Sequence, residues 1–143
     1  MITMEKVKFY MAGGMGGLSI EEQMEWRNDI EDKINRIAPC IPIYFFQPPY
    51  YYQPNGSAHR TEREAREFDL YRLRHSDVVI VNFNVPNSLG TAQELAVAYE
   101  HRIPVIGLNE NKAELHPWLI ECCTRVCETR EELVKHICDF YLT

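Results

Sequence analysis

Residues 76–96 read SDVVIVNFNVPNSLGTAQELA, and they decide the fold. The β-branched run Val78–Val81 predicts a buried strand, the turn-rich segment after it predicts a loop, and Gly90-Thr91 opens a helix with Glu94 in its first turn. In an open parallel sheet, ligands bind in the crevice beyond the carboxyl ends of the strands. This stretch is therefore the first place to look for a functional site.

Strands and helices alternate on both sides of that stretch. Strands are expected at 6–12, 41–46, 78–81, 103–108 and 124–127, and helices at 19–37, 61–75, from 90 onward, 114–122 and 129–141. Ser19, Thr61 and Thr129 each precede a glutamate by three residues, which predicts helix N-caps. The pattern predicts a single α/β domain over 1–143. Its sheet is doubly wound, Rossmann-like or flavodoxin-like, with five parallel strands in the order 2-1-3-4-5 and helices on both faces.

The composition excludes several functional classes. Lysine and arginine number 15 against 21 acidic residues, a net charge of −6, which argues against a protein that grips a nucleic-acid polymer. No apolar run reaches membrane-spanning length, and the N-terminus lacks a signal-peptide core. We therefore expect a cytoplasmic protein with no membrane partner. The 5 cysteines and His116 match no standard zinc spacing, so no metal or cofactor is expected.

A glycine cluster, Gly13-Gly14-Met15-Gly16-Gly17, follows the first strand. Glycines let a backbone bend sharply and approach a ligand, and backbone amides at a strand-to-helix junction favour anions. The cluster matches neither the dinucleotide fingerprint nor the lysine-bearing P-loop. On its own it fits either a ligand site or a tight turn.

The segment 48–59 is rich in proline and tyrosine and is expected to lack regular structure. Its three consecutive tyrosines could form a wall for a planar ring, or could cover the core or a subunit interface. In the following helix, Asp69 stands out from a largely solvated face because Phe68 and Leu73 indicate partial burial.

Strands one and three are neighbours at the topological switch point, so the glycine cluster and residues 88–94 face one crevice. The combination resembles the nucleoside 2-deoxyribosyltransferase family and its relatives, the nucleoside 5′-monophosphate N-glycosidases. The segments that carry the resemblance are FYMAGG at 9–14, Asp69 with Ser76-Asp77, SLGTAQELAVA at 88–98 and IPVI at 103–106.

The resemblance implies a catalytic set. Glu94 matches the family's nucleophilic glutamate, which attacks the anomeric carbon of a 2-deoxyribose and forms a covalent sugar ester that a second base or water resolves. Its place in the first helical turn is expected to favour the ionised form. Tyr10 matches a tyrosine that orients the glutamate. Asp69 matches the aspartate that contacts the nucleobase and exchanges a proton with it.

The resemblance also implies substrate contacts at Gly13, Gly14, Ser88 and Gly90. Asn82 could supply a hydrogen bond to the sugar or base, or could serve in a turn. Many transferases carry an aspartate for the sugar 5′-hydroxyl where this chain has Ser88, whereas a serine there helps the monophosphate hydrolases to hold a phosphate. The expected partners are a nucleoside or nucleotide, a free nucleobase and further copies of the chain. Base transfer, hydrolysis of a 5′-monophosphate, and a non-catalytic nucleotide-sensing module remain three alternatives.

Overall fold

The computed structural model describes residues 5–53, 56–57 and 59–143. In chain order its elements are β1 (Val7–Gly13), α1 (Ile20–Ile37), β2 (Ile43–Phe46), the 3₁₀ helix η1 (Pro48–Tyr51), β3 (Tyr52–Gln53), β4 (Gly56–Ser57), α2 (Glu62–Arg74), β5 (Val78–Asn82), α3 (Leu89–Glu100), β6 (Val105–Leu108), α4 (Pro117–Glu121), β7 (Arg125–Cys127) and α5 (Arg130–Tyr141).

The main sheet has five strands in the order β2-β1-β5-β6-β7, and every neighbouring pair is parallel. In order of appearance within this sheet, that is 2-1-3-4-5, so the predicted doubly wound α/β fold is confirmed. Gly13 at the end of β1 pairs with Asn82 at the end of β5. The loops that leave these two strands therefore start side by side, at the switch point of the sheet.

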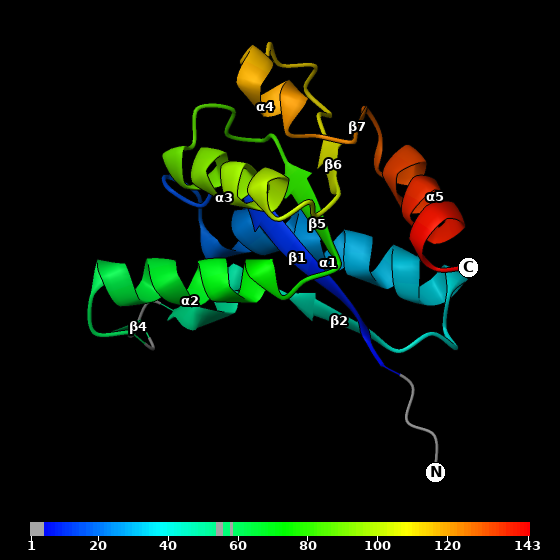
Figure 1. Ribbon diagram of the computed structural model, residues 1–143, viewed down its shortest axis with the longest axis horizontal. Coiled ribbons are helices and arrows are strands. Elements are labelled where there is room, and N and C mark those ends of the chain that lie inside the picture. Colours follow the sequence, from blue (N-terminus) through cyan, green and yellow to red (C-terminus); the bar gives the residue numbers. More distant parts are fainter. Residues whose placement is uncertain (1–4, 54–55, 58) are drawn as a thin grey trace.

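Alternation along each strand divides the core between two faces. Phe9 and Met11 of β1 join a cluster formed with α1 and α5, whereas Tyr10 and Ala12 join a second cluster formed with α2 and α3. Figure 1 shows the same arrangement, with the sheet between these two pairs of helices. Tyr10 therefore points to the side of the sheet on which α3 lies.

Polar caps fix where the helices begin. Ser19 and Glu22 form the predicted capping box, and the side chains of Thr61 and Thr129 accept hydrogen bonds from the third helical residue of α2 and α5. Ser88 caps α3 in the same way, at 3.2 Å from the Thr91 nitrogen, so that α3 begins at Leu89. The helices thus start where short polar side chains satisfy free backbone amides.

The expectation that 48–59 lacks regular structure is wrong. Pro48 and Pro49 open the 3₁₀ helix η1, where their fixed φ angles fit and their missing N–H groups leave no bond unmade. The chain then pairs with itself in the short antiparallel ladder of β3 and β4. Residues 54, 55 and 58 lie outside the described part. Proline and tyrosine content predicted a break in the sheet but not this local pairing.

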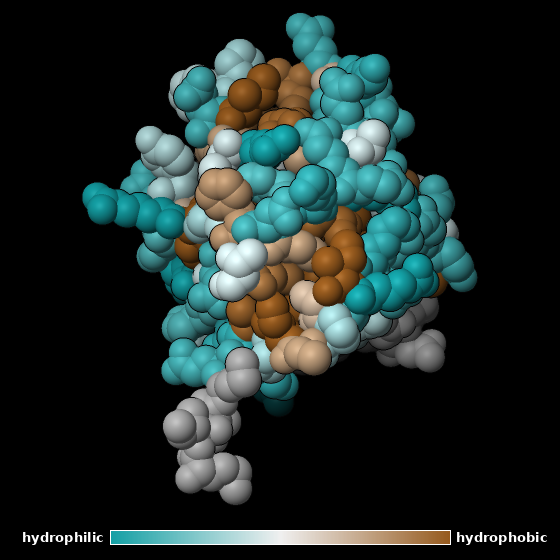
Figure 2. All heavy atoms as spheres, turned by 90° about the vertical axis from the view of Figure 1, so that its right-hand side faces the viewer, coloured by the Kyte–Doolittle hydropathy of each residue, from teal (hydrophilic) through white to brown (hydrophobic). Residues whose placement is uncertain are grey.

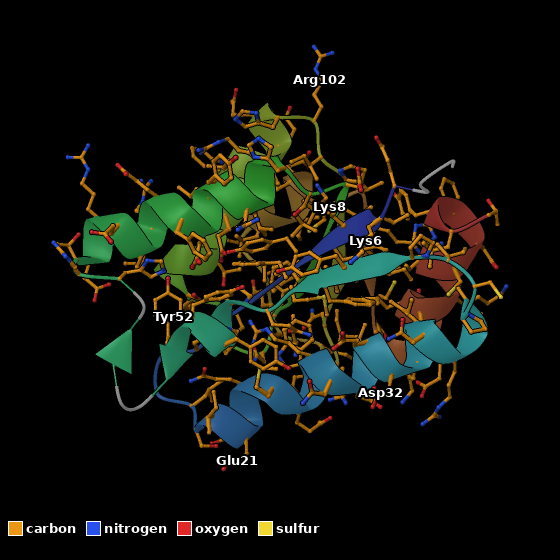
Figure 3. All side chains as sticks on the ribbon, turned by 90° about the horizontal axis from the view of Figure 1, so that it is seen from below. Lys6, Lys8, Glu21, Asp32, Tyr52 and Arg102 are labelled. Carbon is orange, nitrogen blue, oxygen red and sulfur yellow. The ribbon has the colours of Figure 1, made fainter. Side chains whose placement is uncertain are left out.

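The three tyrosines have three different environments. Tyr51 packs between Phe46 and Phe68, with ring centroids 5.3 Å and 5.0 Å away. Tyr50 is 55% exposed. Tyr52 reaches from β3 toward α2, as Figure 3 shows. Tyr51 therefore covers the core, as one of the two alternatives predicted, and Tyr52 extends to Asp69 on the neighbouring helix.

Several large apolar side chains are exposed on the helices, among them Leu89 on α3, Trp118 on α4 and Phe140 on α5. In Figure 2, hydrophobic surface is concentrated near the top, at the height where Figure 1 places α4, and in a band through the middle. Within the described residues, no helix combines the length and apolarity needed to cross a membrane.

Candidate active site

A cavity of about 490 Å³ lies beyond the carboxyl end of β1. Its walls come from the glycine loop after β1, from α1, from η1 and β3, from α2, and from the first turns of α3. Glu94, Asp69, Ser88, Gly13 and Gly90 all line it. The switch point of the sheet thus brings together five of the eight predicted site residues in one hollow.

Glu94 and Tyr10 meet at this cavity. The Tyr10 hydroxyl donates a hydrogen bond to the Glu94 carboxylate, across 84 residues of sequence. Tyr10 is fully buried, and its ring stacks on Phe46 at 5.2 Å, so the hydroxyl has a fixed position. Tyr10 does not itself line the cavity. It therefore orients the carboxylate from behind, while Glu94 faces the cavity.

The electrostatics of Glu94 differ from the expectation. Because α3 begins at Leu89, Glu94 lies in the second helical turn, beyond the residues that feel the N-terminal dipole most strongly. Burial raises the pKa of Glu94 to about 7, and the nearby charge of Asp69 also raises it, against the hydrogen bond from Tyr10 and the charge of Arg27. The prediction that the helix start favours the ionised form is therefore wrong, and Glu94 titrates close to neutral pH.

Asp69 projects from α2 into the same cavity. Its Oδ2 accepts a hydrogen bond of 2.9 Å from the Tyr52 hydroxyl, which fixes the carboxyl group. Its Oδ1 is buried and has no hydrogen-bond partner among the described residues. Burial raises the pKa of Asp69 to about 6. One oxygen is thus anchored, and the other is left to exchange a hydrogen bond or a proton with a ligand.

The glycine loop contributes unevenly. Gly13 and Gly16 line the cavity, but Gly14 does not. A Cβ atom on Gly14 would lie 2.4 Å from the Cβ of Val85, and this close approach locks the glycine loop against the loop that follows β5. The structure therefore gives Gly14 a packing role, whereas Gly13 and Gly16 contribute backbone to the cavity wall.

Asn82 lies elsewhere. It follows Ile80 by two residues on β5, so its side chain lies on the face of the sheet that α1 and α5 cover. There it lines a separate hollow of about 340 Å³ beside Trp26, Asn84 and Arg130. Val81 packs on the α3 side of the sheet, and neighbouring residues of a strand point to opposite faces. Strand alternation alone would therefore have placed Asn82 on the other side.

Ser88 and Gly90 stand at the N-terminus of α3, where both line the cavity. The Ser88 hydroxyl accepts a hydrogen bond from the Thr91 amide and keeps its own proton to donate. Helix N-termini attract anions because their first amides lack intrahelical partners. This wall of the cavity is therefore suited to a negatively charged or polar group.

Two arginines that the sequence did not single out also line the cavity. Arg27 reaches it from α1, and Arg66 from α2, where its Nε donates to the Gln93 side chain at 2.8 Å. Arg27 lies four residues after Gln23 on one side of α1, and both line the cavity. The sequence shows that Gln23 and Arg27 share one side of a helix, but it does not show which side of α1 faces the crevice.

No family model and no curated protein match this sequence. The solved structures similar to this fold include the following three. A conserved protein from Enterococcus faecalis is 20% identical, with a TM-score of 0.77 over 94% of this chain and 99% of that chain. A 2-deoxyribosyltransferase from Bacillus psychrosaccharolyticus is 15% identical, with a TM-score of 0.68 over 89% and 90%. The CMP N-glycosidase of Clostridium botulinum is 16% identical, with a TM-score of 0.58 over 94% and 98%. The resemblance seen in the sequence is thus matched by structural similarity over most of the chain.

Proposed function

We propose that this protein cleaves the N-glycosidic bond of 2′-deoxyribonucleosides and transfers the sugar through a covalent ester on Glu94. The observation that carries the proposal is the Glu94 carboxylate, held by the buried Tyr10 hydroxyl at a cavity that also contains Asp69. The cavity volume of about 490 Å³ is adequate for a nucleoside. Two structures with this fold carry names that denote chemistry at such a bond, a 2-deoxyribosyltransferase and a CMP N-glycosidase.

In the first step, a Glu94 oxygen attacks C1′ of the sugar. The bond from C1′ to the base nitrogen breaks, and its electron pair leaves with the base. Asp69 in its protonated form donates a proton to the departing base. Because the pKa of Asp69, about 6, lies below that of Glu94, about 7, the reactive form with protonated Asp69 and ionised Glu94 is a minor one that is most populated between these two values. Glu94 must be ionised to attack, so this step uses the deprotonated form of the group whose pKa is about 7.

In the second step, a free nucleobase or water attacks C1′ and the ester bond to Glu94 breaks. The carboxylate is restored, and the proton that the acceptor loses goes to Asp69. Transfer and hydrolysis therefore use the same residues and differ only in the acceptor.

A second candidate is hydrolysis of a nucleoside 5′-monophosphate. The specific observation in its favour is the wall made by Ser88, the N-terminus of α3 and the glycine loop, which suits an anion. One experiment separates the two candidates: deoxynucleosides and their 5′-monophosphates are incubated with and without a free acceptor base. Base exchange confined to unphosphorylated donors rejects the hydrolase, and sugar-phosphate release confined to monophosphates rejects the transferase.

A trapping experiment tests whether the protein is an enzyme at all. A 2-fluoro-2-deoxyribosyl donor slows the second step, so mass spectrometry should find the sugar attached to a peptide that contains Glu94. If no adduct forms and Glu94→Ala binds nucleosides as well as the parent, the protein is a binding or sensing module instead. We also expect a homo-oligomer, which sedimentation of the purified protein would test.

Tyr10→Phe should lower kcat/KM by about 10- to 100-fold, because Glu94 loses the donor that orients it. The phenylalanine keeps the stacking on Phe46, so folding should be preserved. Since the Tyr10 hydrogen bond lowers the pKa of Glu94, the pH at which the rate is highest should also move upward. A pH series of kcat/KM measures both effects. Tyr99→Phe, an exposed position on α3, is the matched control and should behave as the parent.

Ser88→Asp should lower kcat/KM for a nucleoside 5′-monophosphate at least about tenfold, because like charges repel at close range. The unphosphorylated nucleoside should be affected far less. Asparagine and aspartate both cap helices, so Ser88→Asn is a neutral control of equal size that should preserve α3. Equal effects of Ser88→Asp on both substrates would place the 5′ group away from Ser88.

A further inference from the structure

Arg27 on α1 is buried completely, with 0% of its surface exposed. Its Nε donates to the Met11 carbonyl at 3.2 Å, and its two terminal nitrogens donate to the carbonyls of Gln23 at 2.6 Å and Gly13 at 3.4 Å. The guanidinium also lies 4.6 Å from the ring centroid of Trp26, within the range of a cation–π contact. Arg27 thus ties the end of β1 and the start of the glycine loop to α1.

These contacts leave the charge of Arg27 uncompensated. Buried arginines are normally paired with a carboxylate, because a lone charge in a low-dielectric interior is costly. Carbonyl oxygens and an aromatic face offer only partial charges. Within the described residues, no carboxylate lies within ion-pair distance of Arg27. The cavity that Arg27 lines is therefore the place to look for a negative charge that compensates the guanidinium.

Glu94 presents the complementary problem. Its carboxylate is partly buried and receives a hydrogen bond from the neutral Tyr10 hydroxyl, but it forms no ion pair within the described part of the chain. Glu94 and Arg27 line the same cavity, from α3 and α1. A buried cation and a partly buried anion, neither with an ion-pair partner among the described residues, therefore face one space.

We propose that Arg27 is a positioning residue for Glu94, supplying the counter-charge of its carboxylate across the cavity while it clamps the glycine loop. This inference rests on the proposed function for the role of Glu94 as nucleophile, but the charge pairing itself does not. A substrate that displaces water from the cavity would strengthen the attraction, because the effective dielectric constant falls.

The other charged and titratable groups at the cavity do not replace Arg27. Tyr10 on β1 and Tyr52 on β3 are neutral donors, and the pKa of each is raised. On α2, Asp69 opposes ionisation of Glu94, Glu62 is a further acidic residue of the lining, and Arg66 is exposed and bonded to Gln93. Burial lowers the pKa of Arg27 to about 10, which still leaves it charged at neutral pH. The charge of Arg27 lowers the pKa of Glu94.

The test is a direct titration of Glu94 in the unliganded protein. Glutamate labelled with ¹³C at the side-chain carboxyl is incorporated, and the Glu94 signal is identified as the one missing from Glu94→Gln. Arg27→Met and Arg27→Gln remove the charge, and Arg27→Gln keeps amide donors for the carbonyls if Arg27→Met does not fold. Arg27→Lys keeps the positive charge but loses the planar, multi-donor guanidinium group. Arg36→Met is the matched control, an exposed arginine on the same helix.

We expect the titration midpoint of Glu94 to rise by about one pH unit in Arg27→Met and Arg27→Gln. It should stay close to that of the parent in Arg27→Lys and Arg36→Met. An unchanged midpoint in the two neutral variants would overturn the inference and leave Arg27 with the loop clamp alone. A shifted midpoint in a protein that cleaves no nucleoside would reject the proposed function and retain the charge pairing, so the two failures are distinguishable.

Discussion

Glu94→Gln lowers kcat/KM for N-glycosidic cleavage by about 10⁴-fold or more, because the amide cannot form the sugar ester. Glutamine is close to glutamate in size and can still accept the hydrogen bond from Tyr10, so the fold should be retained. Circular dichroism and nucleoside binding check the fold, and base release measured by chromatography checks the rate. Glu100→Gln makes the same chemical change at an exposed position of the same helix and should keep full activity.

The pH dependence of the parent belongs to the same prediction. The nucleophile is the carboxylate, and its pKa is raised to about 7 by burial. Because Asp69 must also be protonated, the rate should be highest between about 6 and about 7 and should fall on the acid side near pH 6, instead of through the usual range near 4.5. An acid limb at the ordinary carboxyl value, or a Glu94→Gln variant with near-parent activity, would show that Glu94 is not the nucleophile.

Asp69→Asn should lower kcat/KM by about 10²- to 10⁴-fold for ordinary nucleosides, the range expected for loss of general acid catalysis. The asparagine can still accept from Tyr52, so the contact between β3 and α2 is preserved. Glu67→Gln is a suitable control, because Glu67 is an exposed residue of α2 whose ion pair with Arg63 contributes little.

The leaving group gives this prediction its sharpest measurement. A nucleoside of a purine methylated at N7 carries a positive charge on the base and needs no proton to depart. The deficit of Asp69→Asn should therefore shrink markedly with that substrate, whereas the deficit of Glu94→Gln should not. An equal deficit of Asp69→Asn on both substrates would mean that Asp69 binds the base without transferring a proton.

Local chemistry made most of the fold predictable. Ser19, Thr61 and Thr129 are followed by glutamates at cap spacing, and each caps a helix. The β-branched run at β5 gave the central strand, and alternation of strands with helices gave the order of the sheet. The ladder of β3 and β4 was missed because two-residue strands carry no period that a pattern can display.

A site residue could be predicted from the sequence only where the position of its helix or loop also determines which way its side chain points. Glu94, Asp69 and Ser88 line one cavity because the switch point brings their loops and helices together. Glu94 is the sixth residue of α3 and so lies in its second turn, and burial raises its pKa. The roles of Tyr52 and Arg27 depend on contacts between distant segments, which no local pattern encodes.

Folding of the chain takes up protons at the two carboxyl groups of the cavity, those of Glu94 and Asp69. The pKa of Glu94 rises from 4.5 to about 7, and that of Asp69 from 3.8 to about 6. At a pH between the ordinary and the raised pKa of either group, the folded chain holds a proton on that group that the unfolded chain has released. The stability that these groups contribute is therefore complete below their ordinary values and is lost as the pH rises through the raised ones. Glu25 and Asp29, whose pKa values are lowered by contacts with Arg130 and Lys33, act in the opposite sense at lower pH. At neutral pH, where about half of Glu94 is ionised, the protein thus holds its nucleophile in the reactive form at the expense of part of its own stability.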